Sequence, residues 1–293
     1  MKKVLIAGAT GYLGGYITKE LMNNSYTVKA LVRSLEKLEE KNIEVSEIFQ
    51  GEITKSDSIK DCCKDIDIVI STVGITRQKD GLTYMDVDYQ ANMNLLEEAK
   101  KNAVKKFIYV SVLNGENLKN LKICEAKELF VEQLKKSGLD YCIVRPNGFF
   151  SDMTEFYEMA KKGRVYLLGD GKYQTNPIHG EDLAKLCVEA INDSKQEIEV
   201  GGPEILTHDE IAIKAFEALK IEAKITHIPN WMRISILKIA RLFLKDKTYG
   251  PIEFFLTVMA MNMVAPEYGK HTLKEYFTKL KMSDKLNEND SIK

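Results

Sequence analysis

Several features of membrane, nucleic-acid-binding and metal proteins are missing from this sequence. No apolar run approaches the roughly 20 residues that a membrane-spanning helix needs. Acidic and basic residues are mixed along the chain and almost cancel, to a formal net charge of −1, so we expect no nucleic-acid partner. The four histidines show no spacing typical of metal ligands, and no metal is expected. The five cysteines form no CxxC pair, which indicates reduced thiols in a cytosol.

The sequence has instead a glycine-rich segment close to its first residue. Residues 4–7 are an apolar run typical of a buried parallel strand, and residues 12–22 are typical of a helix. We expect Gly8 to form a tight turn, Gly11 to let a pyrophosphate approach the backbone, and Gly14 to allow close helix–strand contact. The N–H groups at the start of the helix would then bind an anion. A glycine-rich turn that binds nothing is the less favoured alternative.

The letters GATGYLG at residues 8–14, with GxxGxxG rather than GxGxxG spacing, are similar to the opening motif of a known group of proteins. The sequence resembles the short-chain dehydrogenase/reductase superfamily, in the extended and atypical branch that includes the NmrA-like proteins. Specific motifs carry this resemblance over about the first 200 residues. It implies a dinucleotide-binding lobe followed by a smaller second lobe.

The alternation of strands and helices predicts an α/β fold with a Rossmann-type doubly wound parallel sheet. After the first strand, the expected strands are residues 27–32, 43–50, 67–73, 106–112 and 139–144, and the expected helices include 56–64 and 88–102. We assign residues 1–150 to an NAD(P)-binding domain, with 172–200 returning to it, and residues 151–293 to a smaller substrate or partner lobe. Because the first strand starts at once, we expect no signal peptide and a cytoplasmic location.

Arg33 lies just past the second expected strand, where cofactor preference is set in such sheets. A guanidinium suits the 2′-phosphate of NADP by charge and shape, whereas an acidic residue would suit the free ribose of NAD. We therefore expect NADP in preference to NAD, with Ser34 and Lys37 in support. An ordinary solvated arginine at the end of a strand is the alternative.

Other cofactor contacts follow from position in the sheet or from the resemblance. Residues 72–74 end the fourth strand, and ligands bind at the carboxyl ends of strands. By resemblance, residues 52–53 contact the adenine and residues 146–148 flank the nicotinamide. The expected cofactor-binding residues are Gly8, Thr10, Gly11, Tyr12, Leu13, Gly14, Arg33, Glu52, Ile53, Thr72, Val73, Gly74, Lys127, Pro146, Asn147 and Gly148.

The resemblance also implies catalytic residues, with one departure. The superfamily has a serine or threonine at the end of the fifth strand and a Tyr-x-x-x-Lys pair on the next helix. Ser111 and Lys127 match these places, but Ile123 replaces the tyrosine and cannot exchange a proton. Three interpretations stay open: Lys127 works without a tyrosine, another group replaces it, or the protein binds the dinucleotide without catalysis. The candidates for another group are Tyr84, Tyr89 and Cys124.

A solvated helix lysine is the alternative interpretation of Lys127. The residues three and four positions away from it are Ile123, Cys124, Phe130 and Val131, so its own helix offers no carboxylate to pair with it. A lysine stem can also cross an apolar face to reach water.

The second lobe offers two further candidates. Residues 231–245 predict an amphipathic helix with basic residues along one side, which suits a membrane surface. Covering a substrate cleft or a partner subunit is the favoured role for its apolar face. His179 has a side chain suited to acid–base chemistry, but a structural role at the start of a helix is favoured.

These features favour an NADP(H)-dependent atypical reductase acting on a small carbonyl compound or an activated double bond, with Lys127 and Ser111 as the catalytic residues. The alternative is a non-catalytic NAD(P)-binding regulator or assembly factor of the NmrA-like type, which would hold a protein partner. A scaffold at a membrane surface is the third and least favoured hypothesis.

Overall fold

The computed structural model describes residues 1–75 and 81–290, and the chain divides into two compact units. The first unit comprises Met1–Pro146 and Leu183–Glu199. The second comprises Asn147–Asp182 and the chain from Val200 onward. The chain therefore leaves the first unit after its sixth strand and returns to it once.

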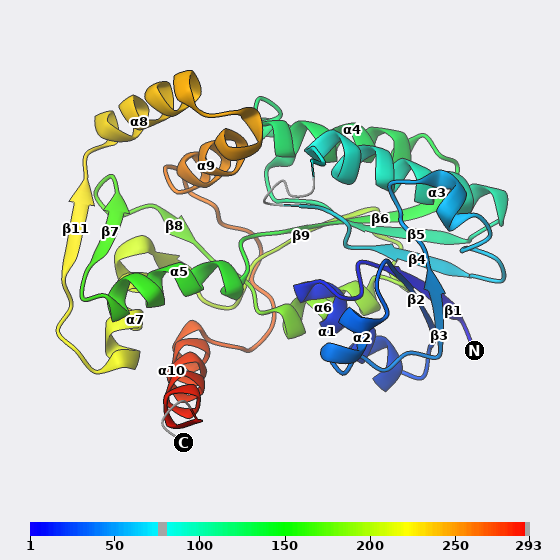
Figure 1. The fold of residues 1–293 in the computed structure, drawn as a ribbon, viewed down its shortest axis with the longest axis horizontal. Coiled ribbons are helices and arrows are strands. Elements are labelled where there is room, and N and C mark those ends of the chain that lie inside the picture. Colours follow the sequence, from blue (N-terminus) through cyan, green and yellow to red (C-terminus); the bar gives the residue numbers. More distant parts are fainter. Residues whose placement is uncertain (76–80, 291–293) are drawn as a thin grey trace. The chain divides into compact units, whose positions relative to one another are not determined.

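A seven-stranded sheet of order β3-β2-β1-β4-β5-β6-β9 contains the strands of the first unit (Figure 1). Its strands are β1 (Lys3–Ala7), β2 (Thr27–Val32), β3 (Glu47–Gln50), β4 (Ile68–Ser71), β5 (Lys106–Val110), β6 (Asp140–Pro146) and β9 (Glu197–Val200). From β3 to β6, each strand pairs in parallel with its neighbour. The strand order reverses between β1 and β4, and ligands of open α/β sheets bind at this point. The predicted Rossmann-type doubly wound sheet is confirmed.

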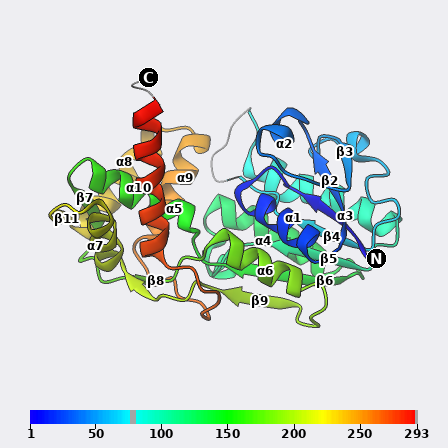
Figure 2. The same cartoon turned by 90° about the horizontal axis from the view of Figure 1, so that it is seen from below.

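Helices cover both faces of this sheet because its central strands are buried on both sides. The helices are α1 (Tyr12–Asn23), α2 (Glu36–Glu40), α3 (Asn92–Lys101), α4 (Lys122–Lys135) and α6 (Gly180–Glu189), with the short elements η1 (Ser56–Ile59), η2 (Met85–Ala91) and η3 (Gly115–Leu118). Helices α1 and α6 lie on one face, and α3 and α4 lie on the other (Figure 1, Figure 2). Phe107 and Tyr109 of β5 pack with Phe130 of α4 in the core.

The second unit contains helices and two small two-stranded sheets, β8 with β10 and β7 with β11. Its elements are α5 (Phe150–Lys161), β7 (Val165–Leu168), β8 (Gln174–Thr175), β10 (Leu206–Thr207), α7 (His208–Leu219), β11 (Ile225–Ile228), α8 (Asn230–Phe243), α9 (Asp246–Val258) and α10 (Leu273–Asp290). A separate core forms where α5, α7 and α10 pack, with Phe156, Phe216 and Phe277 among its residues. Among the described helices, none is both long and apolar enough to cross a membrane.

Three elements differ from the sequence-based expectation. The strand expected at 43–50 is only β3, which lies exposed at the edge of the sheet. The helix expected at 56–64 is only η1, because Asp61 and Asp65 have φ of 64° and 60° and cannot continue a right-handed helix. The helix expected at 88–102 starts earlier, as the π-helical turn η2, which then continues into α3.

Candidate active site

The turn between β1 and α1 has no room for side chains at its glycines. Gly8 has a φ of +93°, and a Cβ there would lie 2.4 Å from Oγ1 of Thr72. A Cβ on Gly14 would lie 2.0 Å from the carbonyl oxygen of Gly8. Gly11 is exposed, and its N–H donates to the Gly8 carbonyl at 2.8 Å. This bare backbone fits the close approach of a pyrophosphate.

Helix α1 begins directly over this turn. Gly11 is its N-cap residue, so no N-cap side chain covers the first N–H groups or the positive end of the helix dipole. The Lys41 ammonium donates to the Thr10 carbonyl at 2.6 Å, which adds positive charge beside the turn. Tyr12 is half-buried, whereas the side chain of Leu13 is buried in the core. The predicted contact from Leu13 would therefore come from its backbone.

The predicted adenine side lies at the ends of β2 and β3. Arg33 is exposed and forms no ion pair with any residue that the structure describes, while its carbonyl accepts from the Gln50 side chain at 3.4 Å. The Glu52 carboxylate accepts hydrogen bonds from its neighbours Lys55 and Thr54, and these bonds lower its pKa. Ile53 packs against the core of the sheet. These positions leave the Arg33 guanidinium available to an anionic ligand.

A buried ion pair lies just past the carboxyl end of β4. Nζ of Lys127 on α4 is 2.9 Å from Oδ1 of Asp88 in η2, and the two side chains are 12% and 0% exposed. A Cβ on Gly74 would lie 2.7 Å from this Nζ and 2.6 Å from this Oδ1. This pairing disfavours the alternative interpretation of Lys127 as a solvated helix lysine, because a carboxylate comes from a different helical element, η2.

Asn92 fixes the position of Asp88 relative to β4. Its amide donates to the backbone carbonyls of Val73 and Asp88, at 3.2 and 2.9 Å, and its side-chain oxygen accepts from Ser71 at 2.6 Å. The backbone N–H of Ile75 donates to the Asp88 carboxylate at 3.2 Å. The π-helical turn and the end of β4 are thereby held together, as expected for π-turns near functional sites.

The ion pair determines which protonation states are favoured. Burial by itself would lower the pKa of Lys127, but the Asp88 carboxylate, with a smaller effect from Tyr109, raises it above its usual value. Burial raises the pKa of Asp88, and the Lys127 ammonium opposes that rise. Lys127 is therefore an ammonium at neutral pH, suited to donating hydrogen bonds and unsuited to acting as a base.

No candidate for the missing tyrosine is exposed at this pair. Ile123 is buried, as is Tyr84, and burial raises the pKa of the buried Cys124 thiol to about 12. Tyr89 is half-buried and packs on the core. The phenol found beside the lysine is Tyr109 of β5, with Lys127 Nζ 5.7 Å from its ring centre.

Tyr109 was missed by the sequence-based reasoning. Its strand residues are buried on both faces, so alternation along β5 gives no signal for which of them faces α4. Burial raises the pKa of Tyr109 to about 12, although the Lys127 ammonium opposes this. The side chain is fully buried, and among the described residues its hydroxyl has no hydrogen-bond partner of good geometry. In this arrangement it supports the lysine from within the core.

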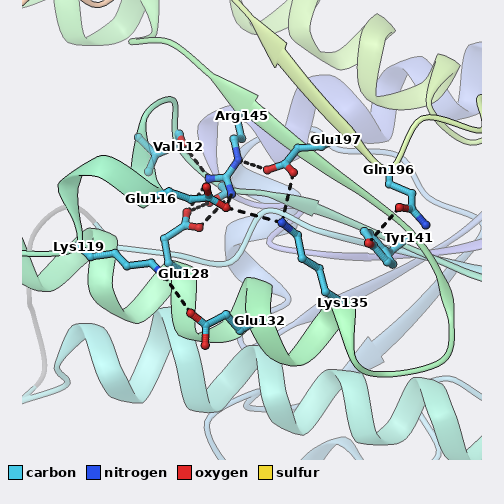
Figure 3. Close-up of polar contacts among 11 residues, drawn as sticks. Val112, Glu116, Lys119, Glu128, Glu132, Lys135, Tyr141, Arg145, Gln196 and Glu197 are labelled. Atoms are coloured by element: carbon cyan, nitrogen blue, oxygen red, sulfur yellow. Dashed lines mark hydrogen bonds and ion pairs between the residues drawn. The ribbon is translucent and has the colours of Figure 1, made fainter.

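Ser111 lies in a second buried network, which is centred on Glu128 and Arg145. Its hydroxyl donates to the Glu128 carboxylate at 3.3 Å. Arg145, 3% exposed, forms two hydrogen bonds with that carboxylate and also pairs with Glu197 (Figure 3). Gly115 leaves room for the pair, since a Cβ there would lie 2.3 Å from Oε1 of Glu128. Any contact from Ser111 to a substrate stays a prediction.

The chain after β6 forms part of the second unit. The Asn147 side chain donates to Asn176 at 2.9 Å and accepts from the Gly148 N–H at 2.8 Å. Its backbone N–H donates to Val200 at 2.8 Å. Asn147 is buried and internally bonded, so any nicotinamide contact here would come from the backbone near Pro146 and Gly148.

The second unit brings His271 close to His179 and Glu181, which lie about 90 positions earlier in the sequence. Ligand atoms of His179, Glu181 and His271 lie within 4.8 Å of one another, and the two imidazole rings stack at 4.3 Å. The N–H of Glu181 donates to Nδ1 of His179 at 3.2 Å, so the neutral ring carries its proton on Nε2. Nδ1 of His271 lies 2.9 Å from the buried Asp182. The tautomer of His179 therefore disfavours metal binding and favours a structural role.

Comparison with known proteins adds independent observations. A family model described as NAD(P)H-binding matches residues 8–194. The divinyl chlorophyllide a 8-vinyl-reductase of Arabidopsis thaliana is 28% identical, over 94% of this chain and 76% of its own length. The photosystem II assembly factor Ycf39 of Synechocystis sp. is 29% identical, over 64% of this chain and 58% of its own length. The structure of the Escherichia coli NADPH-dependent quinone oxidoreductase QOR2 with NADPH has the same fold, with a TM-score of 0.72 at 16% identity over 94% of this chain and 99% of that chain.

Proposed function

Because the chain belongs to the NAD(P)H-binding family, in the atypical short-chain dehydrogenase/reductase group with the NmrA-like proteins, we propose that it is an NADP(H)-dependent reductase. Its substrate is a small compound with a carbonyl group or an activated double bond. The observation that carries the proposal is the Lys127–Asp88 pair held against Gly74. A buried ion pair contributes little to stability by itself, and this one lies where ligands of such sheets bind.

The bound cofactor supplies the hydride. Gly8, Gly11 and Gly14 offer backbone to the pyrophosphate, and the start of α1 offers positive potential. The exposed guanidinium of Arg33, which forms no ion pair with any of the described residues, supports NADP over NAD. Lys127 acts as a hydrogen-bond donor toward the reacting end, and Asp88 keeps it charged and in place.

An activated double bond is the substrate class with the broader support. The Arabidopsis relative, named as a reductase of a vinyl group, aligns with 94% of this chain. Ile123 removes the phenol that the superfamily uses for carbonyl chemistry, and the Ser111 hydroxyl is directed to Glu128. We further propose that residues 151–293 provide the substrate- or partner-binding surface and that the protein acts in the cytoplasm.

A non-catalytic NAD(P)-binding assembly factor is the second candidate. Two observations favour it: the alignment with Ycf39, named as a photosystem II assembly factor, and the absence of a phenol at position 123. In this case the dinucleotide would bind at the same glycine turn, and a protein would take the place of the small substrate.

The test is a titration with NADPH and NADH, followed by hydride transfer to a panel of carbonyl compounds and conjugated alkenes. We expect tighter binding of NADPH and turnover of at least one alkene, abolished in Lys127→Ala. Lys100→Ala, which removes an exposed lysine paired with Glu97, is the matched control and should leave turnover unchanged. Binding without turnover across the panel would favour the assembly factor, and no binding of either nucleotide would refute both.

A further inference from the structure

Helix α8 exposes its apolar side. None of its 14 residues is buried. At 100° per residue, Met232, Ile236, Ile239 and Phe243 share one face, and Trp231 and Leu242 extend it on one side. The exposed fractions are 67% for Trp231, 79% for Leu242 and 80% for Phe243. Large apolar side chains exposed together on one face indicate an interaction surface.

The opposite side of α8, which carries basic residues together with Ile234 and Leu237, lies toward α9 in the second unit. Arg241 lies over the ring of Tyr249, 5.0 Å from its centre. A shallow groove is lined by Arg233, Ile234, Leu237, Lys238, Arg241, Leu242 and Tyr249. An amphipathic helix that packed only to build a core would present its apolar face to its neighbour. Here the face centred on Ile239, which is absent from this groove, is left uncovered.

Charge identifies the partner that fits this face. From residue 223 to residue 245 there is no aspartate or glutamate, in a chain with 43 of them. By helical position, Lys238 borders the apolar face beside Trp231 and Leu242, and Arg233 lies toward its other border. Lys245 follows the helix, in the connection to α9. Positive charge on both borders of an apolar stripe matches a layer that is apolar at depth and carries phosphates at its surface.

We propose that α8 docks on the surface of a bilayer that contains anionic phospholipids, with its axis in the plane of the interface. The side chains of Ile239, Leu242 and Phe243 enter the boundary between headgroups and acyl chains. Trp231 lies at headgroup level, and the lysines contact lipid phosphates. This attachment is peripheral, since no described helix can span a membrane. It is independent of the proposed reductase activity.

The chain contains its own probe, because Trp231 is its only tryptophan. The full-length protein is mixed with vesicles of phosphatidylcholine alone or with phosphatidylglycerol added. We expect co-sedimentation with the anionic vesicles, a blue shift of the Trp231 emission, and loss of both at high salt. Quenching by brominated acyl chains would report insertion of the helix.

Two double variants separate the apolar and ionic contributions. Leu242→Gln/Phe243→Gln should abolish sedimentation, and Lys238→Gln/Lys245→Gln should weaken binding about 30-fold. Because these side chains are exposed, circular dichroism should show unchanged folding. The matched controls are Ile221→Gln/Met282→Gln and Lys60→Gln/Lys195→Gln, which change exposed side chains outside α8 and should bind like the original protein.

Four results would overturn the proposal. The first is absence of binding to anionic vesicles, and the second is equal binding by the α8 variants and the controls. The third is a concentration-dependent blue shift without lipid, together with dimerisation in the ultracentrifuge, which would identify a second copy of the chain as the occupant. A blue shift produced by NADPH or substrate, with no vesicle binding, would likewise assign the helix to the active site.

Discussion

Removing one partner of the Asp88–Lys127 pair should destabilise the protein strongly, whereas removing both should not. Asp88→Asn leaves a lysine that is 12% exposed without the carboxylate 2.9 Å away, and Lys127→Met leaves a fully buried carboxylate. Each change should lower the free energy of unfolding by about 3–5 kcal/mol. The double variant removes both charges and should recover at least about 2 kcal/mol of the summed loss.

The single variants should also differ in pH dependence. In Lys127→Met no cation opposes burial, so the pKa of Asp88 stays raised in the folded state. The unfolded state then releases its proton at a lower pH than the folded state. The free energy of unfolding should therefore fall as pH rises above about 4, by up to about 1.4 kcal/mol per pH unit, until the folded carboxyl also ionises. The double variant should lack this slope.

The assay is urea unfolding followed by circular dichroism, at pH 5 and pH 8, for the original protein, both single variants and the double variant. Lys100→Ala serves as the control for an exposed lysine and should change the free energy by less than about 1 kcal/mol. If each single variant also lowers the free energy of unfolding by less than about 1 kcal/mol, and the double variant by the sum of the two, the pair behaves as a solvated surface pair. In that case Asp88 would not determine the charge of Lys127.

Three further predictions concern the cofactor and the two units. Arg33→Ala should weaken NADPH binding about 10-fold or more with little effect on NADH in fluorescence titrations, and equal weakening would contradict the assignment. Glu128→Gln should cost about 3 kcal/mol of unfolding free energy, against less than about 1 for the more exposed Glu197→Gln, and equal costs would refute the role given to burial. Burial lowers the pKa of His208 from 6.5 to about 4. As pH falls from 6.5 to 4, the free energy of unfolding of the original protein should therefore drop by up to about 3 kcal/mol more than that of His208→Phe. Parallel curves of unfolding free energy against pH for the two proteins would contradict this.

The cofactor side of the fold was predictable because its signals are local. The apolar run of β1, the glycines at 8, 11 and 14, and the start of α1 occur within the first residues of the chain. At positions 8 and 14 a side chain would collide with neighbouring atoms, so glycine is required there and appears as a motif in the sequence. The doubly wound parallel sheet followed from the alternation of strands with helices.

The contacts around Lys127 were not predictable in the same way. Helical spacing shows only which neighbours of Lys127 share its own helix, whereas Asp88 comes from a π-helical turn whose phase differs from that of an α-helix. The left-handed backbone at Asp61 and Asp65 shortened an expected helix, and aspartate adopts that conformation without a clear sequence signal. His179 and His271 meet only through the fold of the second unit.

The position of Asp88 bears on the chemistry that Ile123 leaves possible. In the superfamily mechanism a lysine lowers the pKa of a phenol, and the phenol exchanges the proton. Here the positive charge of the Lys127 ammonium is balanced by the Asp88 carboxylate. The nearby phenol of Tyr109 is buried, and its pKa is raised to about 12. Both groups hold their protons firmly at neutral pH, which disfavours a mechanism that needs a strong acid in the site. A substrate whose own conjugation stabilises the charge left by hydride addition makes the smallest demand on such an acid. An activated double bond is therefore favoured over an unactivated carbonyl group as the proposed substrate.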